Sequence, residues 1–401
     1  GPHSMVDLSR MILSKGYRLD FRRQMNDMWR DAEDIPLSQM EVADTYDDLL
    51  TRFGRKTNFT YSPQFTGNSS KLEEELSIDS GSTNIVLFTS SLDERFGLDY
   101  IASATDHSLG CVDTFPSQIE WIESVIQWSQ NFPNINVIVR VHPREDANHR
   151  DSSKSSHLNL LEQRFKNTPS NTRIIWPQSS ISTYDLMGLA TVALVSWSSV
   201  GHEAARLGIP TMITTSKAGP YTGEEILHPT DPADYFQELE RMISSEPSTR
   251  DVVNAWRWYH FYHVKPTLDI PTVNHPSKVV HTDNLAHEID QLMKHDTPVV
   301  STKLNEFRRQ GRDRIEELSA LRAAFYRLLF YFCVGTEIKH SIDLPIIDVT
   351  RGQTPTKNGR GYFLLEEGAV TFNMKPHTLS ARHQLACLLY TSDAADDDHC
   401  V

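Results

Sequence analysis

Short apolar runs alternate with amphipathic segments between residues 84 and 215. Five runs share an uninterrupted apolar centre, namely NIVLFTS from Asn84, NINVIVRVHP from Asn134, TRIIWP from Thr172, TVALVSWSS from Thr191 and IPTMITT from Ile209. Each run is too short for a helix and too continuously apolar for a strand with one solvated face, so each predicts a strand buried on both faces. Helices are predicted at 117–130, 157–166, 182–189, 199–207 and 234–245. This alternation predicts an α/β fold, a doubly wound parallel sheet of Rossmann-like type with flanking helical segments.

The pattern changes several times along the chain and predicts domain boundaries. Residues 1–61 have helical apolar spacing and predict a helical remnant of an amino-terminal domain, and the Ser-, Gly- and acid-rich residues 62–83 predict a linker. The Rossmann-like domain is predicted at 84–262. A Pro- and His-rich connection at 263–300 and a helical region at 301–387 follow.

The two ends of the chain differ from the rest. The first methionine is Met5, after GPHS, which fits either a cloning scar or the interior of a longer chain. Residues 388–401, LLYTSDAADDDHCV, resemble translated sequencing-adaptor read-through, so we predict that they are an artefact and draw no functional inference from them.

Composition narrows the class of protein. With 401 residues, 39% hydrophobic and 23% charged, the chain has the composition of a globular protein of two or three domains. Its net charge of −14 argues against nucleic acid as a partner. The cysteines are scattered and predict neither a disulfide framework nor a zinc site, which favours a reducing, cytoplasmic location: Cys111, Cys333, Cys387 and Cys400. No apolar run has the roughly 18 residues that a membrane span needs, and no signal peptide is recognised.

Two clusters outside the alternating region have a structural and a functional interpretation. Aromatic residues between 256 and 262 predict a helix packed across a domain surface, with a base-stacking platform as the less favoured alternative. A long helix is predicted at 304–333. Basic side chains near its start predict a solvated face, with docking to anionic lipid or glycan at the inner face of a membrane as the alternative: Arg308, Arg309, Arg312 and Arg314.

Ligands of a doubly wound sheet bind at the carboxyl ends of the strands, so the loops there are the candidate site. The first loop supplies the hydroxyls of Ser90 and Ser91 and the carboxylates of Asp93 and Glu94. Either carboxylate can act as base or nucleophile, but paired acids at a helix start more often interact with the helix dipole.

The second loop contains the dipeptide His142-Pro143 directly after a predicted strand. His142 can hydrogen-bond a phosphate or protonate a leaving group, and Pro143 fixes the turn that orients it. Arg140, two residues earlier, can add a bidentate positive charge. A histidine-proline pair is a weak signal without this strand context.

The later loops supply more polar groups. Ser198, Ser199 and Gly201 lie at a helix start that predicts a phosphate cradle of N–H groups and hydroxyls. Glu203 can accept from ribose hydroxyls or act as a capping-box partner. A nucleobase-side wall is predicted from the third loop, where the serines can also be simple helix caps: Gln178, Ser182 and Tyr184.

The order of SSLDE, Gln118, VRVHP, WPQSSISTYDL and SWSSVGHEAARLGIP resembles the carboxy-terminal nucleotide-binding domain of GT-B glycosyltransferases of the capsular polysaccharide biosynthesis group, over residues 84–262. That group includes β-Kdo transferases and is distantly similar to bacterial sialyltransferases. The resemblance implies a metal-independent transferase with no cofactor, a nucleotide-sugar donor such as CMP-Kdo, and a glycan or glycolipid acceptor.

By resemblance, His142, Ser198 and Ser199 bind the donor nucleotide and its phosphate, Glu203 lies near the donor sugar or ribose, and Asp93 or Glu94 attacks the sugar. Only 83 residues precede the predicted domain, which implies an incomplete acceptor domain. Two alternatives stay open: a sugar-nucleotide epimerase of the same architecture, and a non-catalytic subunit that binds nucleotide or glycan.

Overall fold

The computed structural model describes residues 10–12, 29–30, 32–53, 61–67, 69–79, 82–97, 113–148, 152–196, 198–215, 226–245, 248–264, 267–269, 314–334, 360–365 and 368–373. The chain forms two compact units. One consists of Gly1–Thr60 and Asn254–Leu321, and the other of Tyr61–Val253 and Arg322–Val401.

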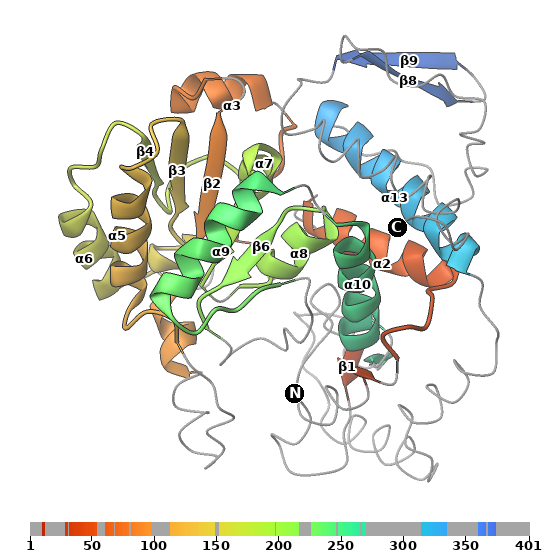
Figure 1. The fold of residues 1–401 in the computed structure, drawn as a ribbon, viewed down its shortest axis with the longest axis horizontal. Helices are drawn as coiled ribbons and strands as arrows, with labels where there is room; N and C mark the ends of the chain where they lie inside the picture. The colour runs from red at the N-terminus through yellow and green to blue at the C-terminus, as the bar shows by residue number, and fades with distance from the viewer. Residues whose placement is uncertain are drawn as a thin grey trace, which may run out of the picture. The chain divides into compact units, whose positions relative to one another are not determined.

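The second unit contains a five-stranded parallel sheet, seen in Figure 1. Its strands, in spatial order, are β4 (Thr172–Ile175), β3 (Ile135–Arg140), β2 (Thr83–Phe88), β5 (Val192–Val195) and β6 (Thr211–Ile213). Each strand coincides with one of the apolar runs of the sequence, with β2 beginning one residue before its run, and the alternation of strands with helices confirms the predicted doubly wound α/β fold. The strand order reverses between β2 and β5, so the topological switch point lies where these two strands end.

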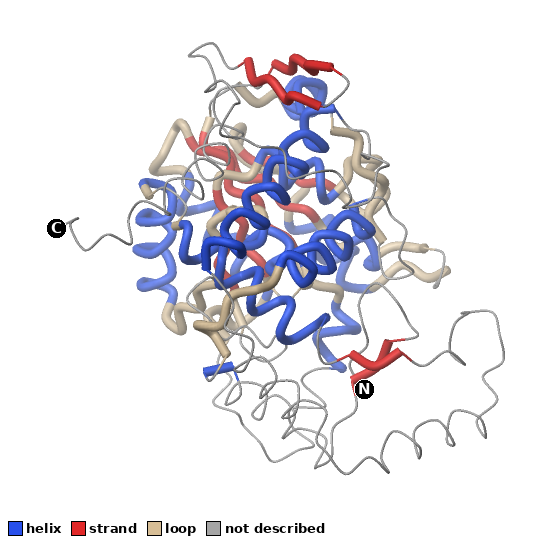
Figure 2. The backbone as a smooth tube through the Cα atoms, turned by 90° about the vertical axis from the view of Figure 1, so that its right-hand side faces the viewer, coloured by secondary structure: helices blue, strands red, loops and turns tan. Residues whose placement is uncertain are grey.

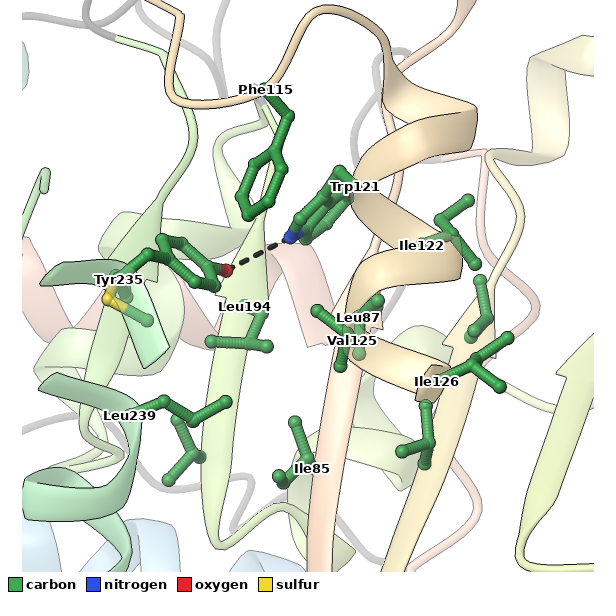
Figure 3. Close-up of a cluster of buried hydrophobic side chains, with 14 of the residues drawn as sticks. Ile85, Leu87, Phe115, Trp121, Ile122, Val125, Ile126, Leu194, Tyr235 and Leu239 are labelled. Atoms are coloured by element: carbon green, nitrogen blue, oxygen red, sulfur yellow. Dashed lines mark hydrogen bonds between the residues drawn. The ribbon is translucent and has the colours of Figure 1, made fainter. Parts of the chain in front are cut away.

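One face of the sheet packs against α5 (Gln118–Ser129), α6 (Ser156–Arg164) and α9 (Pro232–Ser244). Alternate residues of β2, such as Ile85 and Leu87, enter this core because successive side chains of a strand point to opposite faces. Figure 3 shows the indole of Trp121 directed at Tyr235, with the N–H donating to the phenol oxygen at 3.0 Å. Burial raises the pKa of Tyr235, so the phenol stays neutral in this core.

The other face carries α7 (Thr183–Leu189), which contacts β2, and α8 (Val200–Arg206), which contacts β5 and β6. Gly208 follows the end of α8 and has a φ of 71°, a conformation in which a side chain would be strained. The N–H groups of Gly208 and Ile209 bond back to Ala205 and Ala204, so the chain turns directly into β6.

Residues 62–83 are not the linker that their composition predicts. They include α3 (Ser69–Leu76), and Phe65, Leu72 and Leu76 are buried. The polar composition misled because half of a short amphipathic helix is solvated, while leucines four residues apart share one buried face.

The first unit contains α2 (Gln39–Phe53) and most of α10 (Thr249–Tyr259), which continues into a π-helical turn, η2 (His260–Val264). Trp258 is fully buried, and its ring lies 5.2 Å from that of Trp29. The aromatic cluster is therefore packed inside the unit, as expected of a structural helix.

Strand β1 (Arg10–Ile12) pairs antiparallel with β7 (Thr267–Asp269), so this part of residues 1–61 is a strand and not a helix. Pairing with a segment more than 250 residues away is a tertiary contact that local apolar spacing does not encode.

In the carboxy-terminal part, α13 (Arg314–Val334) lies within the predicted long helix. Strands β8 (Arg360–Leu365) and β9 (Gly368–Asn373) form an antiparallel pair where a helical region is predicted. Their runs, RGYFLL and GAVTFN, are rich in aromatic and β-branched residues, which favour strands.

Some predictions concern residues that the structure does not describe. These are most of the predicted connection, the basic residues 308–312 and all of 388–401. Figure 2 distinguishes the described helices and strands from the rest of the chain, and no described helix is long and apolar enough to cross a membrane.

Candidate functional site

The loops that follow β2, β3 and β5 meet at one edge of the sheet, because these strands are neighbours and parallel. Ser90 and Ser91 follow β2, His142 follows β3, and Ser198 and Ser199 follow β5. The sheet therefore brings three of the predicted loops to its carboxyl edge, where the fold favours ligand binding.

Arg140, the last residue of β3, is a buried cation without a counter-ion. Its side chain is 2% exposed, and Nη1 donates to the carbonyl of Trp176 at 2.8 Å. The Nε and Nη2 atoms have no hydrogen-bond partner, and no carboxylate of the described residues forms an ion pair with Arg140. Burial lowers the pKa of Arg140 to about 10, so the guanidinium is still charged at neutral pH. A buried charge of this kind is costly unless an anion compensates it.

His142 is held in one tautomer. Its backbone N–H donates to Thr89 Oγ1 at 2.8 Å, and its Nδ1 lies 3.2 Å from the backbone N–H of Arg144. Because a backbone N–H is always a donor, Nδ1 must accept, and the neutral ring carries its proton on Nε2. Burial lowers the pKa of His142. The negative charge of the nearby Glu94 carboxylate raises this pKa, but by less than burial lowers it. The ring is therefore suited to donate a hydrogen bond from Nε2, whereas its predicted role as a proton donor would require the disfavoured cation.

Lowering the pH from about 7.5 to about 5 should destabilise the chain through His142 and His157. Burial lowers the pKa of both side chains below the usual 6.5, so the unfolded chain binds more protons than the folded chain in this window. Their contribution to the free energy of unfolding is complete above about pH 6.5 and is lost as the pH falls through the folded pKa. This contribution is measured by urea unfolding of the wild type, His142→Asn and His157→Asn at several pH values.

Burial raises the pKa of Glu145 and Asp185, so the folded chain binds more protons at these two carboxylates than the unfolded chain does. Their contribution to stability therefore increases on acidification, opposite to that of the two histidines. The test is therefore the difference between wild type and variant: the variants should lose less stability on acidification. Equal slopes in all three proteins would contradict the expected effect.

The predicted carboxylates of Asp93 and Glu94 both bind Arg144. Arg144 Nη1 donates to Glu94 at 2.6 Å, and Nη2 pairs with Asp93. Burial alone would lower the pKa of Arg144, but the charges of Glu94 and Asp93 raise it above its usual value. The two acids are thus engaged in holding a cation, and the nucleophilic role implied for one of them stays a prediction.

Tyr61 completes this cluster from the other side. The guanidinium carbon of Arg144 lies 5.4 Å from the centre of the Tyr61 ring, within the range of a cation–π contact. The rings of Tyr61 and His142 are 6.2 Å apart. Sequence reasoning missed both Arg144 and Tyr61. The arginine follows the histidine by two residues and had a local signal, whereas Tyr61 comes from a segment 80 residues away and had none.

The segment that carries Tyr61 is anchored to the start of α7. Asp185 accepts hydrogen bonds from Thr66 N, Thr66 Oγ1 and Gly67 N at 3.0 to 3.2 Å. Ser62 Oγ accepts from the N–H of Thr183 at 2.8 Å. Two groups of bonds therefore hold this segment in place, and Tyr61 with it.

The predicted nucleobase wall has mostly structural contacts. Ser182 is fully buried and caps α7 by accepting from the N–H of Tyr184 at 3.2 Å, while the Tyr184 side chain is buried. Gln178 is exposed and donates to Asp146. The helix-cap alternative describes Ser182, and the binding roles of the three residues stay predictions.

The loop after β2 is rigid. Ser90 exchanges two hydrogen bonds with the Gln118 amide, at 2.8 and 3.1 Å. The N–H of Leu92 donates to the buried carboxylate of Glu145 at 2.7 Å. Between these fixed points, Ser91 Oγ is buried and has no hydrogen-bond partner. A fixed loop with an unused hydroxyl is a pre-organised contact for a ligand.

The start of α8 differs from the predicted phosphate cradle. Ser199 Oγ bonds Glu203 Oε1 at 3.1 Å and does not cap the helix. The N–H of Gly201 donates to the carbonyl of Ser198 at 3.2 Å, and that of Val200 weakly to Ser198 Oγ at 3.4 Å. Fewer N–H groups are free than predicted, because Ser198 folds back onto the helix start. Glu203 is buried and bonds a serine hydroxyl rather than the backbone N–H of a capping box.

Comparisons with known proteins add little to this geometry. No family model and no curated protein matches the chain. Similar solved structures include the spinosyn rhamnosyltransferase SpnG complexed with spinosyn aglycone, with 11% identity over 46% of this chain and 42% of that chain and a TM-score of 0.27. UDP-GlcNAc 2-epimerase from Neisseria meningitidis bound to UDP-GlcNAc shows 14% identity over 53% and 50%, with a TM-score of 0.29.

The wall teichoic acid polymerase TagF shows 12% identity over 63% of this chain and 52% of that chain, with a TM-score of 0.29. The chain thus spans about half the length of the structures that it matches. Because these similarities are slight, the class of protein rests on the sheet itself: a doubly wound α/β domain with an unneutralised cation at its carboxyl edge.

Proposed function

We propose that the carboxyl edge of this sheet binds a nucleotide sugar, and that the chain is the donor-binding part of a GT-B glycosyltransferase. The observation that carries this proposal is Arg140, a buried guanidinium with two nitrogens that have no partner, and no carboxylate paired with it, among the described residues. A bound anionic ligand is the simplest way to compensate such a charge. The proposal of a phosphate follows from the position of Arg140 at the end of a parallel strand.

The chemistry of the site suits a leaving nucleotide. When the bond between sugar and phosphate breaks, negative charge develops on the phosphate oxygens. A fixed cation at Arg140 and an N–H donor at His142 Nε2 can stabilise that charge without reorganising. This is the metal-independent mode that the resemblance at VRVHP and SWSSVGHEAARLGIP implies.

The finer assignment also rests on that resemblance. We infer a donor of the CMP-linked type, such as CMP-Kdo, and a glycan or glycolipid acceptor in the synthesis of a capsule or surface polysaccharide. The proposed partners are therefore the nucleotide sugar and the acceptor, with no resident cofactor and a cytoplasmic site of action at or near the inner face of the membrane.

A non-catalytic nucleotide-binding subunit is the second candidate. It is favoured by the pairing of Asp93 and Glu94 with Arg144, which leaves neither carboxylate poised to attack a sugar. Hydrolysis of the bound donor separates the two candidates, because a binding subunit leaves the nucleotide sugar intact.

Thermal unfolding of the full chain with CMP, UDP, GDP and their sugars tests the proposal. A ligand at 100 times its dissociation constant should stabilise the chain by about 2.7 kcal/mol. His142→Ala should remove most of this effect, whereas Arg164→Gln, at an exposed position of α6, should leave it unchanged. The absence of any nucleotide effect on the wild type would refute the proposed function.

A further inference from the structure

Arg95 crosses the switch point of the sheet. It lies in the short helical segment 92–97 after β2, and its backbone N–H donates to the carbonyl of Ser91 at 3.2 Å. Its Nη1 donates to Ser196 Oγ at 2.9 Å, and Ser196 is the residue directly after β5. The side chain therefore connects the carboxyl ends of the two strands between which the strand order reverses. Sequence reasoning included no role for it.

The positive charge of Arg95 is only weakly compensated. Among the described residues its guanidinium donates one hydrogen bond, and the acceptor is a neutral hydroxyl. Asp113 Oδ2 forms a long ion pair with Nη2 at 3.8 Å, which is beyond hydrogen-bond distance. Its side chain is 18% exposed, so a ligand can reach it. Burial lowers the pKa of His157, and the positive charge of Arg95 lowers it further. The electric field of Arg95 therefore reaches His157.

Ser91 provides a second and independent observation at this place. It is 1% exposed, and its hydroxyl has no hydrogen-bond partner among the described residues. It precedes Arg95 by four residues, and its backbone carbonyl accepts from the N–H of Arg95 at 3.2 Å. Burying a hydroxyl without a hydrogen-bond partner destabilises the fold, and a ligand oxygen that bonds it would remove this cost.

We propose that Arg95 and Ser91 form a second anion subsite at the switch point, which binds a further anionic group of the ligand. The inference rests on the proposed function, in which Arg140 and His142 serve the first phosphate. Strands β3 and β5 lie on either side of β2, about 10 Å apart, so one ligand can reach both subsites. The ligand is then a nucleotide with two anionic groups. The second group is either the second phosphate of a nucleoside diphosphate or the carboxylate of a sugar acid joined to a nucleoside monophosphate.

Calorimetric titration of the full chain with UMP, UDP, CMP and CMP-sialic acid distinguishes these sources. Arg95→Ala should weaken binding of a ligand with two anionic groups (UDP or CMP-sialic acid) by about tenfold or more relative to the corresponding monophosphate (UMP or CMP), since the variant loses a charge-assisted hydrogen bond. A selective loss for UDP identifies a diphosphate, a selective loss for CMP-sialic acid identifies a sugar acid, and either supports the subsite. Arg95→Lys should retain part of the preference.

Ser196→Ala is the matched control, because it removes the hydrogen bond of Arg95 but keeps the charge. It should preserve the preference for the ligand with two anionic groups. The inference is overturned if Arg95→Ala weakens binding of ligands with one and with two anionic groups equally, or if Ser196→Ala reproduces the whole effect, since Arg95 would then be a structural contact. If the wild type binds no nucleotide at all, the proposed function fails as well, so the two failures are distinguishable. Urea unfolding of each variant confirms that it is folded.

Discussion

Replacing Arg140 with methionine should make the ligand-free chain more stable and at the same time remove its response to nucleotides. Arg140 is 2% exposed and, within the part of the chain that the structure describes, makes one hydrogen bond, to Trp176 O, and has no carboxylate partner. Replacement of buried ion pairs by apolar residues of similar volume is often neutral or stabilising, by up to about 4 kcal/mol, and Arg140 has no ion-pair partner among the described residues to be left unpaired. If a ligand phosphate is the missing counter-ion, the variant should lose the ligand-induced shift in the same step.

Both effects can be measured by urea unfolding with and without the nucleotide that stabilises the wild type. Arg173→Met is a suitable control, because Arg173 lies on the neighbouring strand β4 but its guanidinium is satisfied by the carbonyls of Leu76 and Ser170. That variant should lose stability and keep the nucleotide effect. A destabilised Arg140→Met protein that still responds to nucleotide would contradict both the electrostatic argument and the proposed site.

The opposite result is expected for Arg257, a buried arginine that does have a counter-ion. Its Nε and Nη2 atoms donate to the Glu317 carboxylate at 2.7 and 2.6 Å, with side-chain exposures of 5% and 0%. Arg257 Nη1 also donates to the carbonyl of Glu33, and Glu317 accepts from the N–H of Leu37. Arg257→Met should destabilise the first compact unit by about 3–5 kcal/mol, because it leaves a buried carboxylate unpaired.

Urea unfolding followed by tryptophan fluorescence suits this measurement, since Trp258 lies next to Arg257 in the sequence and is fully buried in the same unit. The double variant Arg257→Met/Glu317→Gln should recover part of the loss, because the neutral amide can still accept from Leu37 N. A loss below about 1 kcal/mol for Arg257→Met would show that the pair is energetically no different from an exposed one. Two buried arginines of one chain thus give stability changes of opposite sign.

Local sequence was sufficient for much of the site. β3 ends at Arg140, and His142 follows it by two residues at the carboxyl edge, so the strand pattern alone located this residue. The serines after β2 and β5 were located in the same way. In contrast, the hydrogen bonding at the start of α8 could not be predicted. Ser198, and not Ser199, accepts through its side chain from the N–H of Val200, and this depends on backbone angles that the residue types do not specify.

The sequence by itself determined the α/β class, the number of strands in the parallel sheet and the loops at its edge, because strands buried on both faces need apolar runs of a characteristic length. Only the tertiary structure decided which charges are compensated. It pairs Asp93 and Glu94 with Arg144, holds Tyr61 against that cluster, directs Arg95 to Ser196 and leaves Arg140 without a carboxylate. The physical reason is that electrostatic partners are set by distances of a few ångströms between segments far apart in the chain, and such distances leave no periodic signal in the sequence.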